Sequence, residues 1–471
     1  MMNRDILKLA IPSILANITV PLVGMVDIAV AGHLDTDAAT MIGGIAIGSM
    51  LFDLLYWNFG FLRVGTGGLA AQAYGKGDMA ECARIFTRAV GIALACAMVL
   101  IAIQWVFVKA AFLVVECTPE VRELASQYFF IRIWAAPATL SLMAFKGWFI
   151  GMQDSVSPMI TDFVVNGMNI LMSIILSLGF SIGDLKYAGM GFSGVAAGTV
   201  VAQWTGLTVA VILLIAKYLR RVFRGMDLAG LKDVFKGDQT RRFFSMNADL
   251  FVRSLCFIAI YIGFTVISAR YGDLLLAVCS IMMKLLMIFS YFTDGFAYAG
   301  EALTGRYVGA GNVQMVRSTV KWTFVWSMSI AAVFMGVYHF AGVPMLRMMT
   351  SDMEVVDMAR IYLPWLLLMP VAGCAAFTWD GIYIGATASR SMRNSMLWAT
   401  LAFALVWLAG IGVLRLSGAV PEAEAPSPYG IMAVHVLMAA YFAHLLARTV
   451  HLSVRYKKDV LGPTAGFIAE N

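Results

Sequence analysis

The stretch Gly65-Thr-Gly-Gly-Leu-Ala-Ala-Gln-Ala-Tyr-Gly75-Lys-Gly77-Asp78 has a divergent second copy, Ala299-Gly-Glu-Ala-Leu-Thr-Gly-Arg-Tyr-Val-Gly309-Ala-Gly311-Asn312. The offset between the copies, from Gly77 to Gly311, is 234 residues. The same offset separates Gly147-Trp-Phe-Ile-Gly151 from Gly381-Ile-Tyr-Ile-Gly385. Glycine pairs are common in membrane helices, so one such match would be weak evidence. Two distant matches with one offset indicate an internal duplication.

The composition places both halves of the chain in a membrane. Of the 471 residues, 61% are hydrophobic and 13% are charged, and the mean hydropathy is +0.81. A soluble domain carries about 25% charged residues. A spanning helix needs about 20 mainly apolar residues, and the sequence contains about twelve such stretches. We therefore predict an all-α integral membrane protein with twelve transmembrane helices in two pseudo-symmetric six-helix lobes.

The predicted boundaries follow from these stretches and from the charged segments between them. The expected spans are 6–32, 40–63, 85–108, 123–148, 158–181, 189–216, 243–268, 274–300, 318–340, 355–382, 394–416 and 430–450. We expect an N-terminal lobe at 1–216, a basic inter-lobe linker at 217–241, a C-terminal lobe at 242–452 and a tail at 453–471. The first span is too long for a signal-peptide core and lacks a small-residue cleavage pattern, so we expect it to be retained.

Charge in the loops predicts the orientation in the membrane. Basic residues gather in the 217–242 segment, after the last span and after the second span, whereas the opposite loops are acidic or neutral. Basic loops stay on the cytoplasmic side, so both termini and the linker are expected in the cytoplasm of a bacterium, with the chain in its inner membrane. Each half has an even number of spans, so the halves enter the membrane in the same orientation, related by an axis along its normal. This geometry favours alternating access over a fixed pore.

Patterns of catalytic or metal-binding residues are missing from the sequence. The six cysteines form no CxxC pair, and the five histidines show no HExxH spacing. Disulfides, thiolate metal sites and cofactors are therefore not expected. The spans also lack DDxxD-type carboxylates or a convincing pair of nucleophile and base, so we do not predict an enzyme.

Asp27 is the clearest functional candidate because apolar residues flank it on both sides within the first span. A carboxylate inside the membrane costs a few kcal/mol, so it is a functional hypothesis by default. The alternative is a side chain that snorkels to the interface or forms a structural pair. Pro12 and Pro21 each remove a backbone hydrogen bond from this span and are expected to bend it, although membrane helices also tolerate proline for structural reasons.

The fifth expected span carries a polar stripe. Its members recur at steps of four, three, four and four residues and share one helical face: Asp162, Asn166, Asn169, Ser173 and Ser177. Such a stripe can line a cavity or serve as a seam between helices. At 1.5 Å per residue, Asn169 lies roughly 18 Å into its span and Thr199 roughly 15 Å into the sixth. Asp27 has a comparable depth, so these oxygens predict a site for a small hard cation or a proton.

Four other ionisable residues lie in expected spans, and their roles stay open. Asp53 and Lys284 are flanked by apolar residues, while Asp294 and Glu301 are seven residues apart on one helical face. Together with Asn166, they are candidates for lining a substrate cavity. They can also pair with one another, or with Arg63 or Arg253.

Several long motifs resemble one known family, the multidrug and toxic compound extrusion (MATE) family, and specifically its DinF-like branch. The motifs are Asn17-Ile-Thr-Val-Pro-Leu-Val-Gly-Met-Val-Asp27 with Ala31-Gly-His-Leu, Phe61-Leu-Arg-Val-Gly-Thr-Gly-Gly-Leu-Ala-Ala-Gln-Ala-Tyr-Gly75, Asp294-Gly-Phe-Ala-Tyr-Ala-Gly-Glu301-Ala, and Asp380-Gly-Ile-Tyr-Ile-Gly-Ala-Thr with Met392-Arg-Asn-Ser-Met396. The resemblance covers nearly the whole chain. It implies an antiporter that exports organic, often cationic and amphipathic compounds in exchange for protons or sodium.

The resemblance also implies where the coupling ion binds. The family's site in the first lobe is matched by Asp27, Asn169 and Thr199. Family members often have an aspartate one turn after the asparagine, where this chain has Ser173. A missing carboxylate weakens the binding of a bound cation, so the sequence favours proton coupling, with weaker sodium binding as the alternative.

The sequence therefore predicts a secondary active multidrug efflux antiporter, acting as a monomer on small drug-like molecules in a lipid bilayer, without a nucleic-acid partner. A flippase for a lipid or lipid-linked saccharide is the main alternative, and a channel or membrane-embedded enzyme is disfavoured. An offset of 234 residues from the four site residues leads to Tyr261, Phe403, Trp407 and Ala433. None of these is a comparable ligand, so we expect the coupling site in the first copy alone.

Overall fold

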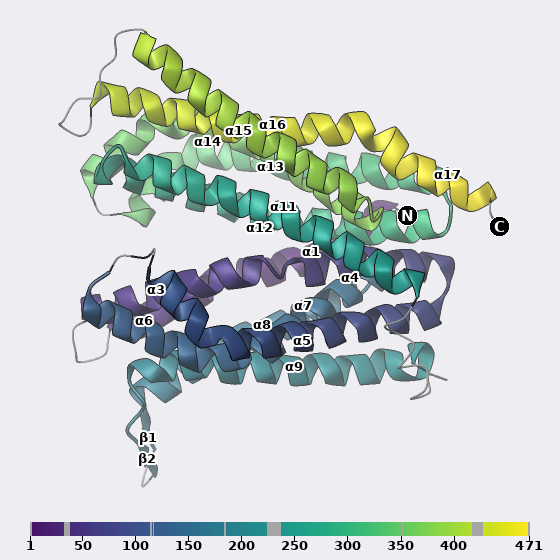
Figure 1. The fold of residues 1–471 in the computed structure, drawn as a ribbon, viewed down its shortest axis with the longest axis horizontal. Coiled ribbons are helices and arrows are strands. Elements are labelled where there is room, and N and C mark those ends of the chain that lie inside the picture. Colours follow the sequence, from purple (N-terminus) through teal and green to yellow (C-terminus); the bar gives the residue numbers. More distant parts are fainter. Residues whose placement is uncertain are drawn as a thin grey trace. The chain divides into compact units, whose positions relative to one another are not determined.

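The computed structural model describes residues 2–32, 38–113, 115, 117–182, 185–223, 237–350, 352–416 and 427–469 (Figure 1). By length and composition, twelve helical segments in these residues can cross a membrane, and they correspond one to one with the expected spans. The predicted fold class is confirmed. Most helices run beyond the predicted ends, because helical hydrogen bonding continues past the apolar stretch into the polar layers of the bilayer.

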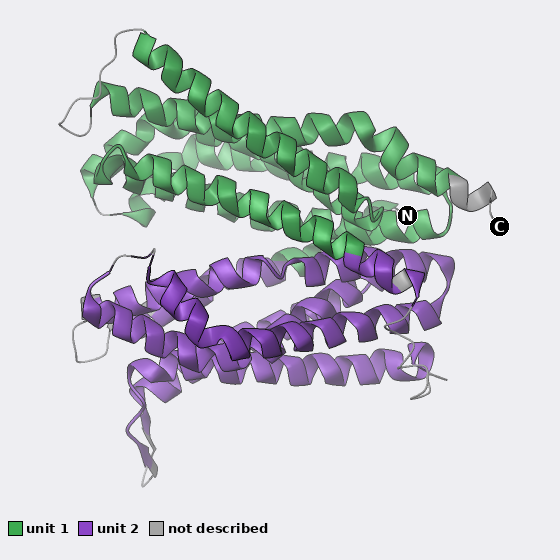
Figure 2. Ribbon diagram, viewed as in Figure 1, with its two compact units in different colours: residues 1–14, 245–471 green, residues 15–244 purple. Residues whose placement is uncertain are grey.

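The described residues group into two compact units (Figure 2). The unit of residues 15–244 contains the end of helix α1, Met2–Ile18, and the first residues of α11. Its other elements are α2 Val20–Gly32, α3 Ala38–Trp57, α4 Phe61–Lys76, α5 Met79–Ala111, α6 Pro119–Arg132, a 3-10 turn at Ile133–Ala135, α7 Ala136–Gly151, α8 Val156–Leu178, β1 Phe180–Ile182, β2 Leu185–Tyr187 and α9 Phe192–Val222. The two antiparallel strands form a short hairpin that the all-α prediction did not contain.

The other unit joins residues 1–14 to residues 245–471. Its elements are the start of α1, most of α11 Asp238–Ala269, α12 Asp273–Gly309, α13 Val313–Met349, α14 Met353–Gly385, α15 Ser389–Leu416, α16 Pro428–Tyr456, a π-helical turn at Lys457–Leu461 and α17 Gly462–Ala469. Both ends of the predicted 217–241 linker are helical, in α9 and α11, and residues 224–236 lie outside the described part of the chain. Of the residues predicted as a tail, 453–456 belong to α16, and 457–469 form the π-helical turn and α17.

The duplication is visible in how helices pack within each unit. A Cβ atom added to Gly147 of α7 would lie 2.2 Å from the backbone oxygen of Arg63 in α4. In the second copy, a Cβ on Gly381 of α14 would lie 2.1 Å from the backbone oxygen of Ala297 in α12. Adding 234 to Gly147 and Arg63 gives Gly381 and Ala297, so the two contacts occupy equivalent positions in the two copies. The repeated glycines therefore mark two equivalent close approaches of helix backbones.

The turns between helices are also duplicated. Gly77 and Gly311 have positive φ angles of 77° and 69°, a backbone region that favours glycine. The residues that follow them, Asp78 and Asn312, cap the next helices by accepting hydrogen bonds from the backbone N–H of the residue three positions later. The local chemistry of the turn, as well as the helix packing, has been kept in both copies.

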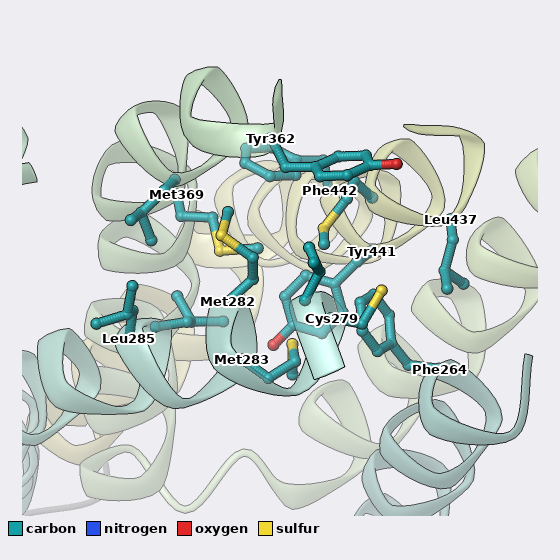
Figure 3. Packing of buried hydrophobic residues seen from close by; sticks show 14 of the residues in the cluster. Phe264, Cys279, Met282, Met283, Leu285, Tyr362, Met369, Leu437, Tyr441 and Phe442 are labelled. Carbon is teal, nitrogen blue, oxygen red and sulfur yellow. The ribbon is translucent and has the colours of Figure 1, made fainter. Parts of the chain in front are cut away.

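Large apolar and aromatic side chains fill the core of the unit that contains α12 to α16. Phe264, Met282 and Tyr441 are among its buried members (Figure 3). In the other unit, Trp148 is fully buried and donates a hydrogen bond from Nε1 to the backbone oxygen of Cys82, at 2.8 Å. Buried aromatic groups with satisfied N–H donors stabilise such a core.

Asp154 links the turn before α8 to the end of α9. Its carboxylate accepts hydrogen bonds from the backbone N–H and the hydroxyl of Ser157, from Lys217 Nζ at 3.0 Å and from Tyr218 OH at 3.0 Å. Burial alone would raise the pKa of Asp154. The hydrogen bonds from Ser157 and Lys217 outweigh it, and the pKa lies below its usual value.

We expect Asp154→Asn to lower the stability of the folded chain at pH 7 by about 1 kcal/mol. A lowered pKa means that the ionised carboxylate stabilises the fold above its unfolded pKa of about 3.9, and that this contribution is lost as the pH falls through the folded value. The difference between variant and wild type should therefore shrink toward pH 3. Thermal unfolding of the full chain in detergent, followed by tryptophan fluorescence, measures the stability of wild type and variant at each pH. Glu120→Gln, at an exposed site, is the control, and a constant difference across this range would contradict the assignment.

Candidate functional site

Helix α8 positions the polar stripe, and four of its five members reach different partners, whereas Ser177 Oγ is buried without a hydrogen-bond partner among the described residues. Asp162 Oδ2 accepts a hydrogen bond from Lys146 Nζ of α7 at 2.7 Å, and the two side chains form an ion pair. Asn166 donates to the hydroxyl of Thr19, between α1 and α2. Asn169 and Ser173 are buried, and they contact α9 and α2. The stripe therefore joins four parts of one unit through polar contacts.

The four predicted coupling residues form one connected network. Ser173 Oγ lies 3.1 Å from Asp27 Oδ1 and 3.2 Å from Asn169 Oδ1, and can donate to either oxygen. Asn169 Nδ2 donates to Thr199 Oγ1 at 3.1 Å. All four side chains are at most 7% exposed. Residues far apart in the sequence, on α2, α8 and α9, are thus brought together around one carboxylate.

Glycines of α9 make this arrangement possible. A Cβ on Gly198 would lie 2.6 Å from the backbone nitrogen of Ser173, and one on Gly194 would lie 2.4 Å from the backbone carbon of Leu176. Helix α9 therefore lies close against the stretch of α8 that carries the network. Thr199, next to Gly198, reaches Asn169 because of this short separation.

The helix that carries Asp27 is interrupted about two turns before it. Helix α1 ends at Ile18, a turn follows at Thr19, and α2 begins at Val20 with Pro21 in its first turn. Pro21 has no backbone N–H to continue the helical ladder, which accounts for a break at this point. Pro12 lies inside α1. The break separates the carboxylate from the first part of the span.

Arg132 belongs to this neighbourhood and was not predicted from the sequence. Its guanidinium lies 4.8 Å from the centre of the Phe52 ring and donates to Tyr128 OH at 3.0 Å. It interacts electrostatically with both Asp27 and Asp53. An arginine inside the fourth expected span, 123–148, was the available signal, but sequence spacing does not show which acids such a residue faces.

The other cavity candidates differ in exposure. Asp53 and Lys284 are exposed, Asp294 is half-buried and Glu301 is fully buried. Arg253, which was a possible partner for these residues, instead pairs with Asp380. A cavity role for the four residues stays a prediction.

The second copy has apolar packing where the first has the network. Ala433 is fully buried. Phe403 belongs to the hydrophobic core of its unit, and Tyr261 and Trp407 pack against that core. The surroundings of these four positions are apolar, as expected for residues that supply no comparable ligands. Within the described residues, no group of three or more His, Cys, Asp or Glu side chains is arranged to hold a metal ion.

Comparison with known proteins assigns the family. The MatE family model matches residues 12–175 and 250–409, which include most of both copies. The chain belongs to the MatE family. DNA damage-inducible protein F of Escherichia coli K12 is 34% identical over 406 residues, 86% of this chain and 85% of that protein. The predicted resemblance to the DinF-like branch is therefore confirmed.

More distant MatE relatives and solved structures agree with this assignment. A probable multidrug resistance protein NorM of Thermotoga maritima is 20% identical, over 87% of this chain and 84% of its own length. The eukaryotic MATE transporter AtDTX14 has the same fold, with a TM-score of 0.80 at 15% identity over 100% of this chain and 98% of that one. A MOP superfamily transporter from Pyrococcus furiosus aligns with a TM-score of 0.78 at 15% identity, over 96% of each chain. The MatE chain described here is thus a multi-pass membrane transporter that acts on small molecules, and not an enzyme.

Proposed function

We propose that the protein is a secondary active antiporter that exports organic compounds in exchange for protons by alternating access. The observation that carries the proposal is the buried network of Asp27, Ser173, Asn169 and Thr199, which contains a single carboxylate. A carboxylate inside a membrane protein can bind and release a proton, which changes the local charge. The family's transport activity supports the rest of the proposal.

Ser173 gives the proposed proton site a way to respond to protonation. When Asp27 is ionised, the Ser173 hydroxyl donates to Oδ1 of this carboxylate. When Asp27 carries a proton, the carboxylic acid can donate to Ser173 Oγ, and the Ser173 hydrogen can turn to Asn169 Oδ1, 3.2 Å away. The change in proton occupancy on α2 is thereby passed to α8. The break at Thr19 provides the place where α2 can move relative to α1.

The chemistry of the network favours protons over sodium. Sodium is a hard cation that prefers several oxygen ligands, and a second carboxylate would help to neutralise it. Ser173 supplies a neutral hydroxyl instead. We retain sodium as the weaker alternative.

We further propose the arrangement in the cell. A cytoplasmic position of this side is supported by the basic residues at the end of α9 and the start of α11, including Arg220, Arg221, Arg241 and Arg242. The transporter then lies in the inner membrane of a bacterium with both termini in the cytoplasm. Its rocking parts are the lobes 1–216 and 242–452, and it works as a monomer.

Efflux from proteoliposomes under separately imposed gradients tests the proposal. Vesicles that contain the full chain and a fluorescent organic cation are given a pH gradient, a sodium gradient or neither. We expect release driven by the pH gradient and little effect of sodium. Equal release without any gradient would contradict coupling, and lipid flipping without any effect of the gradients would favour the flippase alternative.

Ser173→Asp is expected to change the ion preference. A second carboxylate next to Asp27 adds negative charge that a bound cation neutralises, so sodium-driven efflux should rise by about tenfold relative to wild type. Ser173→Ala, which removes the hydroxyl without adding charge, is the matched control and should not gain sodium coupling. Unchanged sodium dependence in Ser173→Asp would show that Ser173 does not set the ion preference.

A further inference from the structure

Three charged side chains meet in the unit that contains α11 to α17. Asp380 of α14 accepts hydrogen bonds at one oxygen, Oδ2, from Arg253 Nη2 of α11 at 2.5 Å and from Arg448 Nη2 of α16. The Arg448 side chain is 1% exposed, that of Asp380 12% and that of Arg253 21%. The cluster is therefore closed on the Arg448 side and accessible at Arg253.

The formal charge of this trio is positive. Each guanidinium keeps its charge at any physiological pH, whereas the trio contains one carboxylate. Two cations share one anion, which leaves an excess charge of +1 on a cluster in the interior of a membrane protein. A charge that is buried without full compensation is costly, and it attracts a group of opposite sign.

Two hydrogen-bond donors of the cluster have no acceptor in the described part of the chain. Arg253 Nε and Arg448 Nε are buried and have no acceptor among the described residues. Guanidinium groups bind planar or tetrahedral oxyanions through pairs of parallel N–H donors. Asp380 engages the Nη2 atom of each arginine. The two Nε–H groups therefore remain as donors for a second acceptor.

The first copy has no corresponding excess of positive charge. Subtracting the offset of 234 from Asp380 leads to Lys146, which pairs one to one with Asp162 at 2.7 Å. The same procedure leads from Arg253 to Thr19 and from Arg448 to Leu214, which are both uncharged. The positive cluster is thus a property of the second copy, as the carboxylate network is of the first.

Aromatic groups adjoin the cluster. The Arg448 guanidinium lies 5.9 Å from the centre of the Phe377 ring. One turn before Arg448, His444 is fully buried, and its ring packs edge-on against that of Tyr441 at 4.6 Å. A ligand here would meet charged donors next to apolar ring faces, a combination that suits an amphipathic molecule.

We propose that Arg253, Asp380 and Arg448 form a binding site for the oxyanion group of an amphipathic organic substrate, such as a carboxylate, sulfonate or phosphate. The transport of this substrate rests on the proposed antiport function, but its binding does not. Arg253 is the accessible contact for the ligand. Arg448 holds Asp380 and completes the positive charge.

Two probes with one fluorophore and opposite charges test the site. Dansyl-taurine carries a sulfonate, and dansylcholine carries a quaternary ammonium. The full chain is placed in nanodiscs of phosphatidylcholine, and binding is followed by fluorescence anisotropy. We expect Arg253→Gln to weaken dansyl-taurine binding by about tenfold, without weakening dansylcholine binding. Arg253→Lys, which keeps the charge but loses the planar donors, should weaken dansyl-taurine less.

The variant Arg253→Gln is chosen because it leaves Asp380 and Arg448 as a neutral pair, so the fold should persist. Arg360→Gln, at an exposed arginine of the same unit, is the matched control and should bind as wild type does. Equal affinity of wild type and Arg253→Gln for dansyl-taurine, or an equal loss for both probes, would overturn the proposal. Addition of phosphatidylglycerol that displaces dansyl-taurine from wild type, but not from Arg253→Gln, would identify a lipid headgroup as the oxyanion source.

Asp27→Asn separates this inference from the proposed function. This variant should bind dansyl-taurine normally while its coupled transport is lost. Retained coupling in Asp27→Asn would refute the antiport site alone. Absent sulfonate selectivity in wild type would refute the oxyanion site alone.

Discussion

Asp27→Asn is expected to reduce ion-coupled efflux from proteoliposomes to the level of protein-free vesicles. Asparagine has nearly the same shape as aspartate and can still accept the hydrogen bond from Ser173 Oγ, which lies 3.1 Å from Asp27 Oδ1 in the wild type. It cannot bind a proton or carry a negative charge. The variant therefore removes the proposed coupling chemistry while keeping the packing around α2, α8 and α9.

A control variant and a stability measurement make this prediction specific. Asp357→Asn, which changes an exposed carboxylate of the other unit, should transport as wild type does. The thermal unfolding temperature of Asp27→Asn should also stay within a few degrees of wild type. Full coupled efflux by a folded Asp27→Asn variant would remove Asp27 from the mechanism.

Gly381→Ala is expected to destabilise the fold by about 3 kcal/mol, because its Cβ atom would lie 2.1 Å from the backbone oxygen of Ala297. A backbone atom cannot move aside as a flexible side chain can, so α14 and α12 must separate. Gly147→Ala should have a similar effect, since its Cβ would lie 2.2 Å from the backbone oxygen of Arg63. Thermal unfolding of the purified variants measures both effects.

The matched controls for this prediction are glycines in helices with open space around them. A Cβ on Gly167 of α8 or Gly336 of α13 has no atom within 4 Å. Alanine is the better helix former, so these substitutions should leave stability unchanged or raise it slightly. If Gly381→Ala unfolds at the same temperature as Gly336→Ala, the close approach of α12 and α14 is not required for the fold.

The sequence predicted the architecture well because the features that decide it are local or periodic. Apolar stretches of sufficient length define spans without knowledge of their neighbours. The glycines of the duplication were visible because a close helix contact excludes any larger side chain. The hairpin at Phe180–Ile182 and Leu185–Tyr187 was missed because each strand has three residues, too few to show a clear alternation.

The candidate site was predictable in part. Helical spacing put Asn169 and Ser173 on one face, the apolar residues around Asp27 singled it out, and depth in the sixth span added Thr199. Hydrogen bonds in the structure join these four residues. The pairing of Arg253 and Arg448 with Asp380 joins residues up to 195 positions apart. No sequence periodicity relates helices that are so distant, so such partners become visible only when the packing of the helices is known.

Substrate-driven proton movement tests the central claim most directly. Proteoliposomes that contain the full chain and a trapped pH-sensitive dye are exposed to an external organic cation, without any imposed ion gradient. We predict that uptake of the cation by the wild type makes the vesicle interior more alkaline, and that Asp27→Asn shows no such change. Cation uptake by the wild type without any change in internal pH, or an equal change in Asp27→Asn, would contradict proton coupling at Asp27.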